Sequence, residues 1–181
     1  DHISLVGKTH GLLTAVKGKI EGTGFFEFDE NYSGFFDWIR EVLNVGKGVG
    51  IIEVKMRSSG MKLLIVNTHL HHRNKDIQAS QVNQLITNLD QLSKSRGLPV
   101  IFGGDFNFDK DSDLYRILAS RYSAVEIDGC TYCKDNIYSF SGQSRQIDHI
   151  FYTKSLFNFS RDEKVRGFIE PETWKGEFLS D

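Results

Sequence analysis

The fold of this chain is decided by the stretch Val100-Ile101-Phe102-Gly103-Gly104-Asp105-Phe106-Asn107. Its apolar start predicts a buried strand, and the glycine pair allows the backbone to turn sharply after it. If the segment stays extended, Asp105 and Asn107 point to the same side, because side chains two residues apart share a face of a strand. A carboxylate accepts protons and a carboxamide both donates and accepts hydrogen bonds, which suits holding a water molecule or a phosphate oxygen. The same residue types dominate polar turns, and the stretch alone is equally compatible with one.

The segments before this stretch alternate between the patterns of strands and helices. Val49–Met56 and Lys62–Asn67 are apolar runs separated by turn residues, which predicts a β-hairpin. Asp76–Ser93 is the clearest helix pattern, with an apolar stripe formed by Val82, Leu85, Ile86, Leu89 and Leu92. The order strand, helix, strand predicts a layered α/β architecture.

Weaker patterns flank this region. Leu12–Val16 predicts a strand and Phe35–Leu43 a short helix. Asp109–Asp113 carries helix-start signals, and a short apolar face follows at Leu114, Ile117 and Leu118. Arg145–Tyr152 is expected to form another strand, with Ile147, His149 and Phe151 on one face and Asp148 on the other.

Two polar residues lie at the ends of these strands. His69 comes just after the apolar run Lys62–Asn67, and its side chain titrates near neutral pH, which makes it a candidate general acid or base. Asp148 lies between apolar neighbours, where a carboxylate is costly unless it is paired. A histidine is the natural partner, because the carboxylate fixes its tautomer and raises its pKa. Taken alone, Asp148 is as compatible with a structural role.

Length and composition restrict the function classes. A chain of 181 residues suits one domain, residues 1–181, with 39% hydrophobic and 25% charged residues as in ordinary globular proteins. A formal net charge of −2 gives no support for broad electrostatic binding to nucleic acid or acidic membranes. No apolar run approaches the length of a transmembrane helix. Cys130 and Cys133 have no second pair at zinc spacing, so two ordinary thiols are expected.

Aromatic residues crowd together between Gly22 and Trp38. They are Phe25, Phe26, Phe28, Tyr32, Phe35, Phe36 and Trp38. Two interpretations remain open: an exposed apolar lip that contacts lipid or the apolar part of a substrate, or packing in the core under a loop.

Four short motifs together resemble the endonuclease/exonuclease/phosphatase superfamily of DNase I-like, metal-dependent phosphodiesterases. They are Asn67-Thr68-His69-Leu70, Gly103-Gly104-Asp105-Phe106-Asn107, Gln146-Ile147-Asp148-His149-Ile150 and Leu179-Ser180-Asp181. The resemblance covers most of the chain from about Gly11 onward. It implies a four-layer αββα sandwich with the site at the edges of the sheets.

The resemblance also implies roles for individual residues. His69 corresponds to the histidine that contacts the scissile phosphate, and Asp148 to the carboxylate that pairs with it. Asp105 and Asn107 correspond to the pair that orients the attacking water and the phosphate. Asp181 corresponds to a carboxylate near the metal, which is expected to be Mg²⁺, with Mn²⁺ as an alternative, because such oxygen-rich sites suit these ions.

The pattern of the family is incomplete in this sequence. The final histidine that follows Asp181 in the family is missing, and so are the early Asn and the Gln-Glu metal ligand expected before Gly11. We therefore expect an incomplete domain that lacks part of the usual N- and C-terminal elements. Little activity is expected from these 181 residues alone.

Within the family, the segment from Phe28 to Gly46-Lys47-Gly48-Val49-Gly50 is most similar to neutral sphingomyelinases. This implies a phospholipid headgroup as substrate and a peripheral membrane contact. A nuclease or a small-molecule phosphatase is the alternative, favoured if Arg73, Lys75 and Arg145 form a basic groove. A binding domain that has lost catalysis is the alternative from another class. Neither the compartment nor the oligomeric state is indicated by the sequence.

Overall fold

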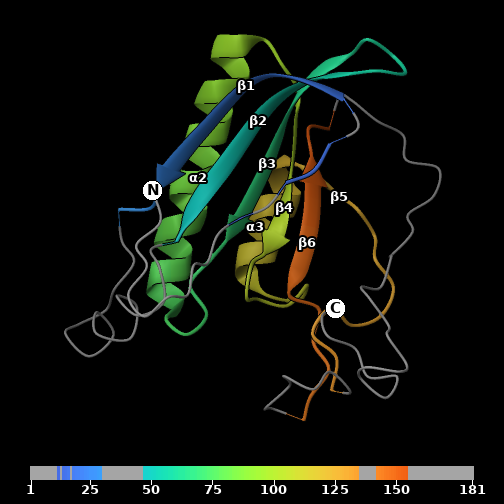
Figure 1. Cartoon of the computed structure of the whole chain (residues 1–181). Helices are drawn as coiled ribbons and strands as arrows, with labels where there is room; N and C mark the ends of the chain where they lie inside the picture. Colours follow the sequence, from blue (N-terminus) through green and yellow to red (C-terminus); the bar gives the residue numbers. More distant parts are fainter. Residues whose placement is uncertain (1–11, 13, 17, 30–46, 135–141, 155–181) are drawn as a thin grey trace, which may run out of the picture.

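The computed structural model describes residues 12, 14–16, 18–29, 47–134 and 142–154 of the chain. In this part a six-stranded mixed sheet carries two helices on one face (Figure 1). The elements are β1 (Gly18–Glu27), β2 (Gly48–Met56), β3 (Lys62–His69), α2 (Lys75–Arg96), β4 (Val100–Asp105), α3 (Asp113–Arg121), β5 (Ser123–Ala124) and β6 (Asp148–Tyr152). The expected α/β class is confirmed, and the described residues supply one sheet and one helix layer of the sandwich.

The strands lie in the order β1-β2-β3-β4-β6-β5. β2 and β3 form the predicted antiparallel hairpin, whereas β3 and β4 are parallel because α2 carries the chain back across the sheet. β6 then pairs antiparallel with β4. This order places β3, β4 and β6 side by side, so the ends of three neighbouring strands meet at one edge of the sheet.

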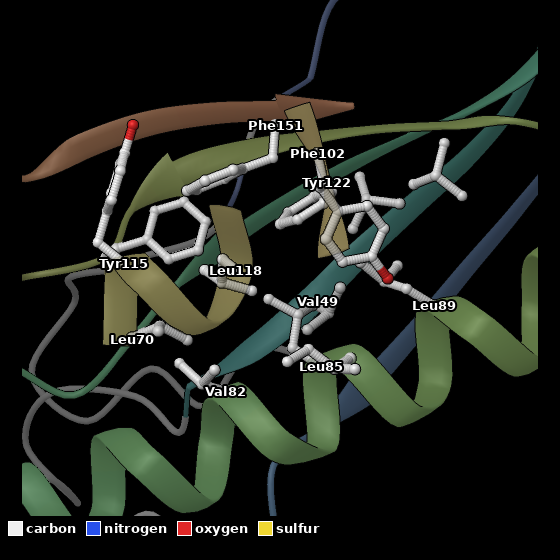
Figure 2. Close-up of a cluster of buried hydrophobic side chains, with 14 of the residues drawn as sticks. Val49, Leu70, Val82, Leu85, Leu89, Phe102, Tyr115, Leu118, Tyr122 and Phe151 are labelled. Atoms are coloured by element: carbon white, nitrogen blue, oxygen red, sulfur yellow. The ribbon is translucent and has the colours of Figure 1, made fainter. Parts of the chain in front are cut away.

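The core lies between the sheet and the two helices (Figure 2). Phe102 of β4 is fully buried and stacks on Phe151 of β6, with ring centroids 5.2 Å apart. Aromatic pairs of this kind add to the free energy gained by burial. The helices contribute the other side of the core, with Val82, Leu85, Ile86, Leu89, Tyr115 and Leu118 buried against the sheet.

The predicted helix is confirmed as α2, and its ends follow from local sequence. The side chain of Asn74 accepts hydrogen bonds from the N–H groups of Asp76 and Ile77, which satisfies donors that the first helical turn leaves free. Gly97 ends the helix with φ 61°, a left-handed conformation that glycine adopts without strain. No helix in the described residues is long and apolar enough to cross a membrane.

Two expectations near the N-terminus have a different outcome. The strand expected at Leu12–Val16 is wrong, since Leu12 and residues 14–16 have no strand structure. The chain instead forms β1 from Gly18 to Glu27, in which most residues are exposed and glycines interrupt the apolar alternation. Such a strand is held by pairing with β2 rather than by a buried face, so it leaves a weak sequence signal. The helix expected at Phe35–Leu43 lies outside the described residues.

Candidate active site

Three of the polar residues expected in the site lie next to one another at one edge of the sheet. The parallel register of β3 and β4 pairs His69 with Asp105, and the antiparallel register of β4 and β6 pairs Asp105 with Asp148. Phe102 and Phe151 point to the helices, so alternation along the strands places Asp105 and Asp148 on the opposite face. The structure thus brings these side chains together, and their roles remain predictions.

His69 and Asp105 approach each other across the parallel strands β3 and β4. Nε2 of His69 lies 3.5 Å from Oδ2 of Asp105, and both side chains are partly exposed. Burial, with a smaller contribution from the nearby positive charge of Lys47, lowers the pKa of His69 to about 4. His69 is therefore neutral at pH 7. The expected contact of His69 with Asp148 stays a prediction.

Asp105 carries a carboxylate with an unusual affinity for protons. Burial raises the pKa of Asp105 to about 6, and the like charge of Asp148 contributes to this shift. Asp105 and Asp148 are paired in the antiparallel register of β4 and β6. The carboxylate of Asp105 therefore takes up a proton at a pH closer to neutral than an ordinary aspartate does.

Asn107 does not extend the strand, which corrects the expectation that Asp105 and Asn107 point to the same side. β4 ends at Asp105, and Asn107 has φ 57°, a left-handed conformation that asparagine tolerates better than most residues. Its N–H donates to Oδ1 of Asp105 at 2.8 Å, and its Nδ2 donates to the carbonyl of Leu70 at 2.9 Å. The second bond fixes the amide plane beside the end of β3.

The glycine pair is required for close packing of the strands. Gly104 has φ 140°, and a Cβ atom built on it would lie 1.9 Å from the carbonyl oxygen of Thr68. A Cβ atom on Gly103 would lie 2.9 Å from the carbonyl oxygen of His149. Both contacts are with backbone atoms, which cannot move away as a flexible side chain does, so the approach of β4 to its neighbours depends on glycine.

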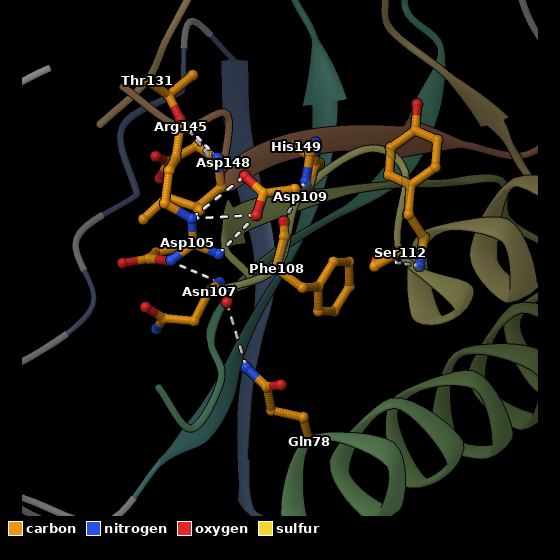
Figure 3. Close-up of polar contacts among 12 residues, drawn as sticks. Gln78, Asp105, Asn107, Phe108, Asp109, Ser112, Thr131, Arg145, Asp148 and His149 are labelled. Carbon is orange, nitrogen blue, oxygen red and sulfur yellow. Dashed lines mark hydrogen bonds and ion pairs between the residues drawn. The ribbon is translucent and has the colours of Figure 1, made fainter. Parts of the chain in front are cut away.

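A buried polar network behind Asn107 was not predicted. Gln81 is fully buried, and its Oε1 accepts from the N–H of His71 at 2.8 Å. Nε2 of Gln78 donates to the carbonyl of His71 at 2.6 Å and to that of Asn107 at 3.3 Å (Figure 3). The sequence did contain a signal for these glutamines. Gln81 directly precedes Val82, and Gln78 lies about one helical turn before Gln81, so both lie beside the apolar stripe of α2.

Further groups hold the loops on the other side of the site. The guanidinium of Arg145 contacts both carboxylate oxygens of Asp109, with Nη2 to Oδ2 at 2.7 Å (Figure 3). The hydroxyl of Thr131 accepts from the N–H groups of Ile147 and Asp148, both at 2.9 Å. These contacts connect residues far apart in sequence, so spacing alone does not reveal them.

The expectation of two ordinary thiols is wrong. Cys130 and Cys133 form a disulfide, with Cα atoms 5.3 Å apart. This distance is within the range that a disulfide requires. The distance depends on how the turn folds, so the Cys-x-x-Cys spacing alone does not predict it.

The aromatic segment divides between the two interpretations. Phe28 is buried and Phe26 packs partly against the core, whereas Phe25 is 57% exposed. Tyr32, Phe35, Phe36 and Trp38 lie outside the described residues, as does Asp181. In the described part of the chain, no three His, Cys, Asp or Glu residues form a group that could hold a metal ion.

Comparison with known proteins identifies the family. The model of the endonuclease/exonuclease/phosphatase family matches residues 6–167. The chain belongs to this family. The family resemblance expected from the motifs is thereby confirmed.

Individual relatives agree with this assignment. The Arabidopsis thaliana protein "Carbon catabolite repressor protein 4 homolog 3" is 35% identical over 75 residues, which is 40% of this chain and 17% of the relative. A mannosyl-6-phosphatase from Bacteroides thetaiotaomicron has a similar structure, with a TM-score of 0.61, 21% identity, and coverage of 77% of this chain and 54% of that one. Sphingomyelinase C from Streptomyces griseocarneus gives a TM-score of 0.58, 17% identity, and coverage of 80% and 52%.

These structural similarities confirm the DNase I-like α/β sandwich fold. The chain spans about half the length of the solved structures and 17% of the curated relative. At such low identity the fold is shared, whereas the substrates of these proteins do not transfer directly to this one.

Proposed function

We propose that the protein is a metal-dependent phosphodiester hydrolase whose reaction takes place at the edge formed by β3, β4 and β6. The observation that carries the proposal is the adjacent row of His69, Asp105 and Asp148, with Asn107 held beside it. Hydrolysis needs a group that takes a proton from water, a group that protonates the leaving oxygen, and polar contacts to the phosphate. The row contains residue types suited to each task.

Asp105 is suited to accept the proton of the attacking water. Its pKa of about 6 leaves it ionised at neutral pH but close enough to neutrality to take up a proton. As the water oxygen bonds to phosphorus, its proton passes to Asp105 and the bond to the leaving oxygen breaks.

His69 is suited to protonate that leaving oxygen. Burial keeps its imidazole neutral in the free protein. A phosphate bound beside it brings a negative charge, which raises the pKa of the imidazole and favours its protonated form. Asn107 would orient a phosphate oxygen or the water through its amide group.

A divalent metal fits the residues present. The carboxylates of Asp105 and Asp148 are the hard oxygen donors that Mg²⁺ and Mn²⁺ prefer, and their mutual repulsion would be relieved by a cation. We propose that Asp148 holds the ion together with Asp181, the metal ligand suggested by the sequence, while Asp105 stays available to accept the proton. When bound, the metal neutralises charge on the phosphate.

The proposal is tested with the full-length protein and a soluble phosphodiester, bis(p-nitrophenyl) phosphate, with Mg²⁺ or with a chelator. Asp105→Asn keeps the shape of the side chain and removes its proton acceptor, so kcat should fall by about 100-fold or more. Asp113→Asn is the matched control, because Asp113 is exposed on α3 and lies outside the row. Unchanged turnover in Asp105→Asn, or in chelator, would contradict the mechanism.

For the substrate, we propose a phospholipid with a phosphodiester headgroup, as in sphingomyelin. The similarity of the segment around Lys47 to neutral sphingomyelinases supports this, as does the exposed ring of Phe25. Phe25 pairs with Gly50, Gly50 with Asn67, and Asn67 with Gly103 across the sheet. This row lies two residues along the strands from the row of His69 and Asp105, so Phe25 is on the same face of the sheet as the site. An exposed aromatic side chain there suits contact with a bilayer interface.

Vesicles test the lipid proposal. Phe25→Ala should weaken binding to sphingomyelin vesicles and raise KM for lipid, while hydrolysis of bis(p-nitrophenyl) phosphate stays unchanged. Ile117→Ala is the control, because Ile117 is 41% exposed but lies on α3, on the helix side of the sheet. Faster hydrolysis of an oligonucleotide or of a sugar phosphate than of sphingomyelin would favour a nuclease or a phosphatase instead.

A further inference from the structure

The side-chain hydroxyl of Thr131, between β5 and β6, contacts the backbone at the start of β6. Thr131 is 7% exposed, and its Oγ1 accepts two hydrogen bonds, from the N–H groups of Ile147 and Asp148. Asp148 is the first residue of β6, so this hydroxyl contacts the backbone at the point where the strand enters the site. The position of the Asp148 carboxylate depends on its backbone, and therefore on Thr131.

Two sets of contacts hold Thr131 in place. Its N–H donates to the carbonyl of Arg145 at 2.9 Å, and Tyr132 exchanges two further backbone hydrogen bonds with Arg145. The disulfide between Cys130 and Cys133 closes the four-residue turn that contains Thr131. A short covalent ring limits the conformations that this turn can adopt.

We propose that Thr131 is a positioning residue for Asp148, and that the Cys130–Cys133 disulfide keeps Thr131 in place, so that reduction of the disulfide lowers activity. The second part rests on the proposed hydrolase function. A dithiol reductant supplies two electrons and two protons: the S–S bond breaks, both cysteines become thiols, and the reductant is oxidised to its cyclic disulfide. Cys130 is only half-buried, whereas Cys133 is 3% exposed, so the sulfur of Cys130 is the more accessible one.

Thr131→Val keeps the shape of the side chain and removes the acceptor, whereas Thr131→Ser keeps the hydroxyl. In the full-length protein, Thr131→Val should lower kcat about 10- to 100-fold with little change in KM, because a misplaced group weakens chemistry more than binding. Thr131→Ser should restore most of the activity. Equal activity of the valine and serine variants would overturn the positioning role.

A matched control is available at the other end of the same strands. Oγ1 of Thr153 accepts from the N–H of Val100 at 3.0 Å, so Thr153→Val loses the same type of bond far from the site. Its kcat should stay within about twofold of the native value. A loss equal to that of Thr131→Val would mean that the effect is merely structural.

Amide hydrogen exchange gives a readout that does not need activity. The N–H of Asp148 should exchange about 10- to 100-fold faster in Thr131→Val and after reduction with dithiothreitol, but not in Thr153→Val. This measurement decides the positioning role even if the native protein hydrolyses no phosphodiester, in which case the proposed function fails separately. Unchanged exchange of Asp148 would overturn the inference.

The redox part is tested by adding dithiothreitol to the assay. Native activity should fall, whereas a Cys130→Ser, Cys133→Ser double variant should have low activity that dithiothreitol leaves unchanged. The double variant also corrects for binding of metal by the reductant. Full activity in the double variant would overturn the role of the disulfide.

Discussion

The side chains of His69 and Asp105 meet 3.5 Å apart across the parallel pair β3–β4, and their pKa values shift in opposite directions. Burial disfavours the charged form of each, which lowers the pKa of His69 to about 4 and raises that of Asp105 to about 6. Between these values both groups are neutral, in contrast to an ordinary ion pair. The pair is therefore not a stabilising salt bridge in this pH range, and its two neutral groups are compatible with the proton transfers proposed above.

The first prediction concerns the pKa of Asp105. Asp148 raises it through like charge and Arg145 lowers it through opposite charge. In metal-free protein, Asp148→Asn should therefore lower the pKa of Asp105, and Arg145→Gln should raise it. Carboxyl ¹³C chemical shifts followed through a pH titration measure both shifts. Shifts of the same sign in the two variants would show that the charges act through a general change of structure.

The second prediction concerns stability in the presence of a chelator. The raised pKa of Asp105 contributes stability that is present below its usual value of 3.8 and is lost as the pH rises through about 6. Asp105→Asn removes this loss, so the variant should be more stable than the native protein at pH 7. This difference in the free energy of unfolding between the variant and the native protein should disappear as the pH falls towards 4. Urea denaturation at several pH values measures it.

His69 provides the opposite case and so serves as the control. Its lowered pKa contributes stability that is present above its usual value of 6.5 and is lost as the pH falls through about 4. The stability of His69→Asn relative to the native protein should therefore be greatest at low pH and should decline towards pH 7. Parallel curves for the two variants would contradict the assignment of the two shifts.

The sequence predicts the elements whose pattern is produced by one buried face. The hairpin of β2 and β3, the helix α2 and the strand β4 all show this periodicity, because each packs against the same core. The motifs at the ends of β3, β4 and β6 also identify candidate residues. Their adjacency follows from the strand order, which no local pattern contains.

Other features depend on contacts that only the folded chain creates. Asn107 turns away from the strand because its backbone bonds to Asp105 and its amide to Leu70, which lies 37 positions earlier. Gln81 is polar yet fully buried, because the N–H of His71 needs a partner there. The residue type alone predicts that a glutamine lies on the exposed face of the helix.

The third prediction concerns Gly104. A Cβ atom at this position meets the carbonyl oxygen of Thr68, so Gly104→Ala should destabilise the protein by about 3 kcal/mol or more. Gly60→Ala is the control, because Gly60 also has positive φ, 70°, but no atom lies within 4 Å of the added Cβ. Its cost should be about 1 kcal/mol. Equal costs in thermal denaturation would show that strand spacing at Gly104 is not limiting.

The fourth prediction concerns Gln78, which connects α2 to the loop after β4. Nε2 of Gln78 donates to the carbonyls of His71 and Asn107, and Gln78→Leu leaves both acceptors without this donor in a buried place. The loss should cost about 1–3 kcal/mol in free energy of unfolding. It should also change the amide chemical shift of Asn107, because the loop loses its connection to the helix.

Gln91→Leu is the control for this prediction, because Gln91 is an exposed residue of the same helix. The substitution is chemically identical, and away from buried contacts it should change the free energy of unfolding by no more than about 0.5 kcal/mol. If both variants are equally stable and the Asn107 signal does not move, Gln78 does not hold the loop. A selective loss in Gln78→Leu would show that α2 determines where Asn107 stands beside His69 and Asp105.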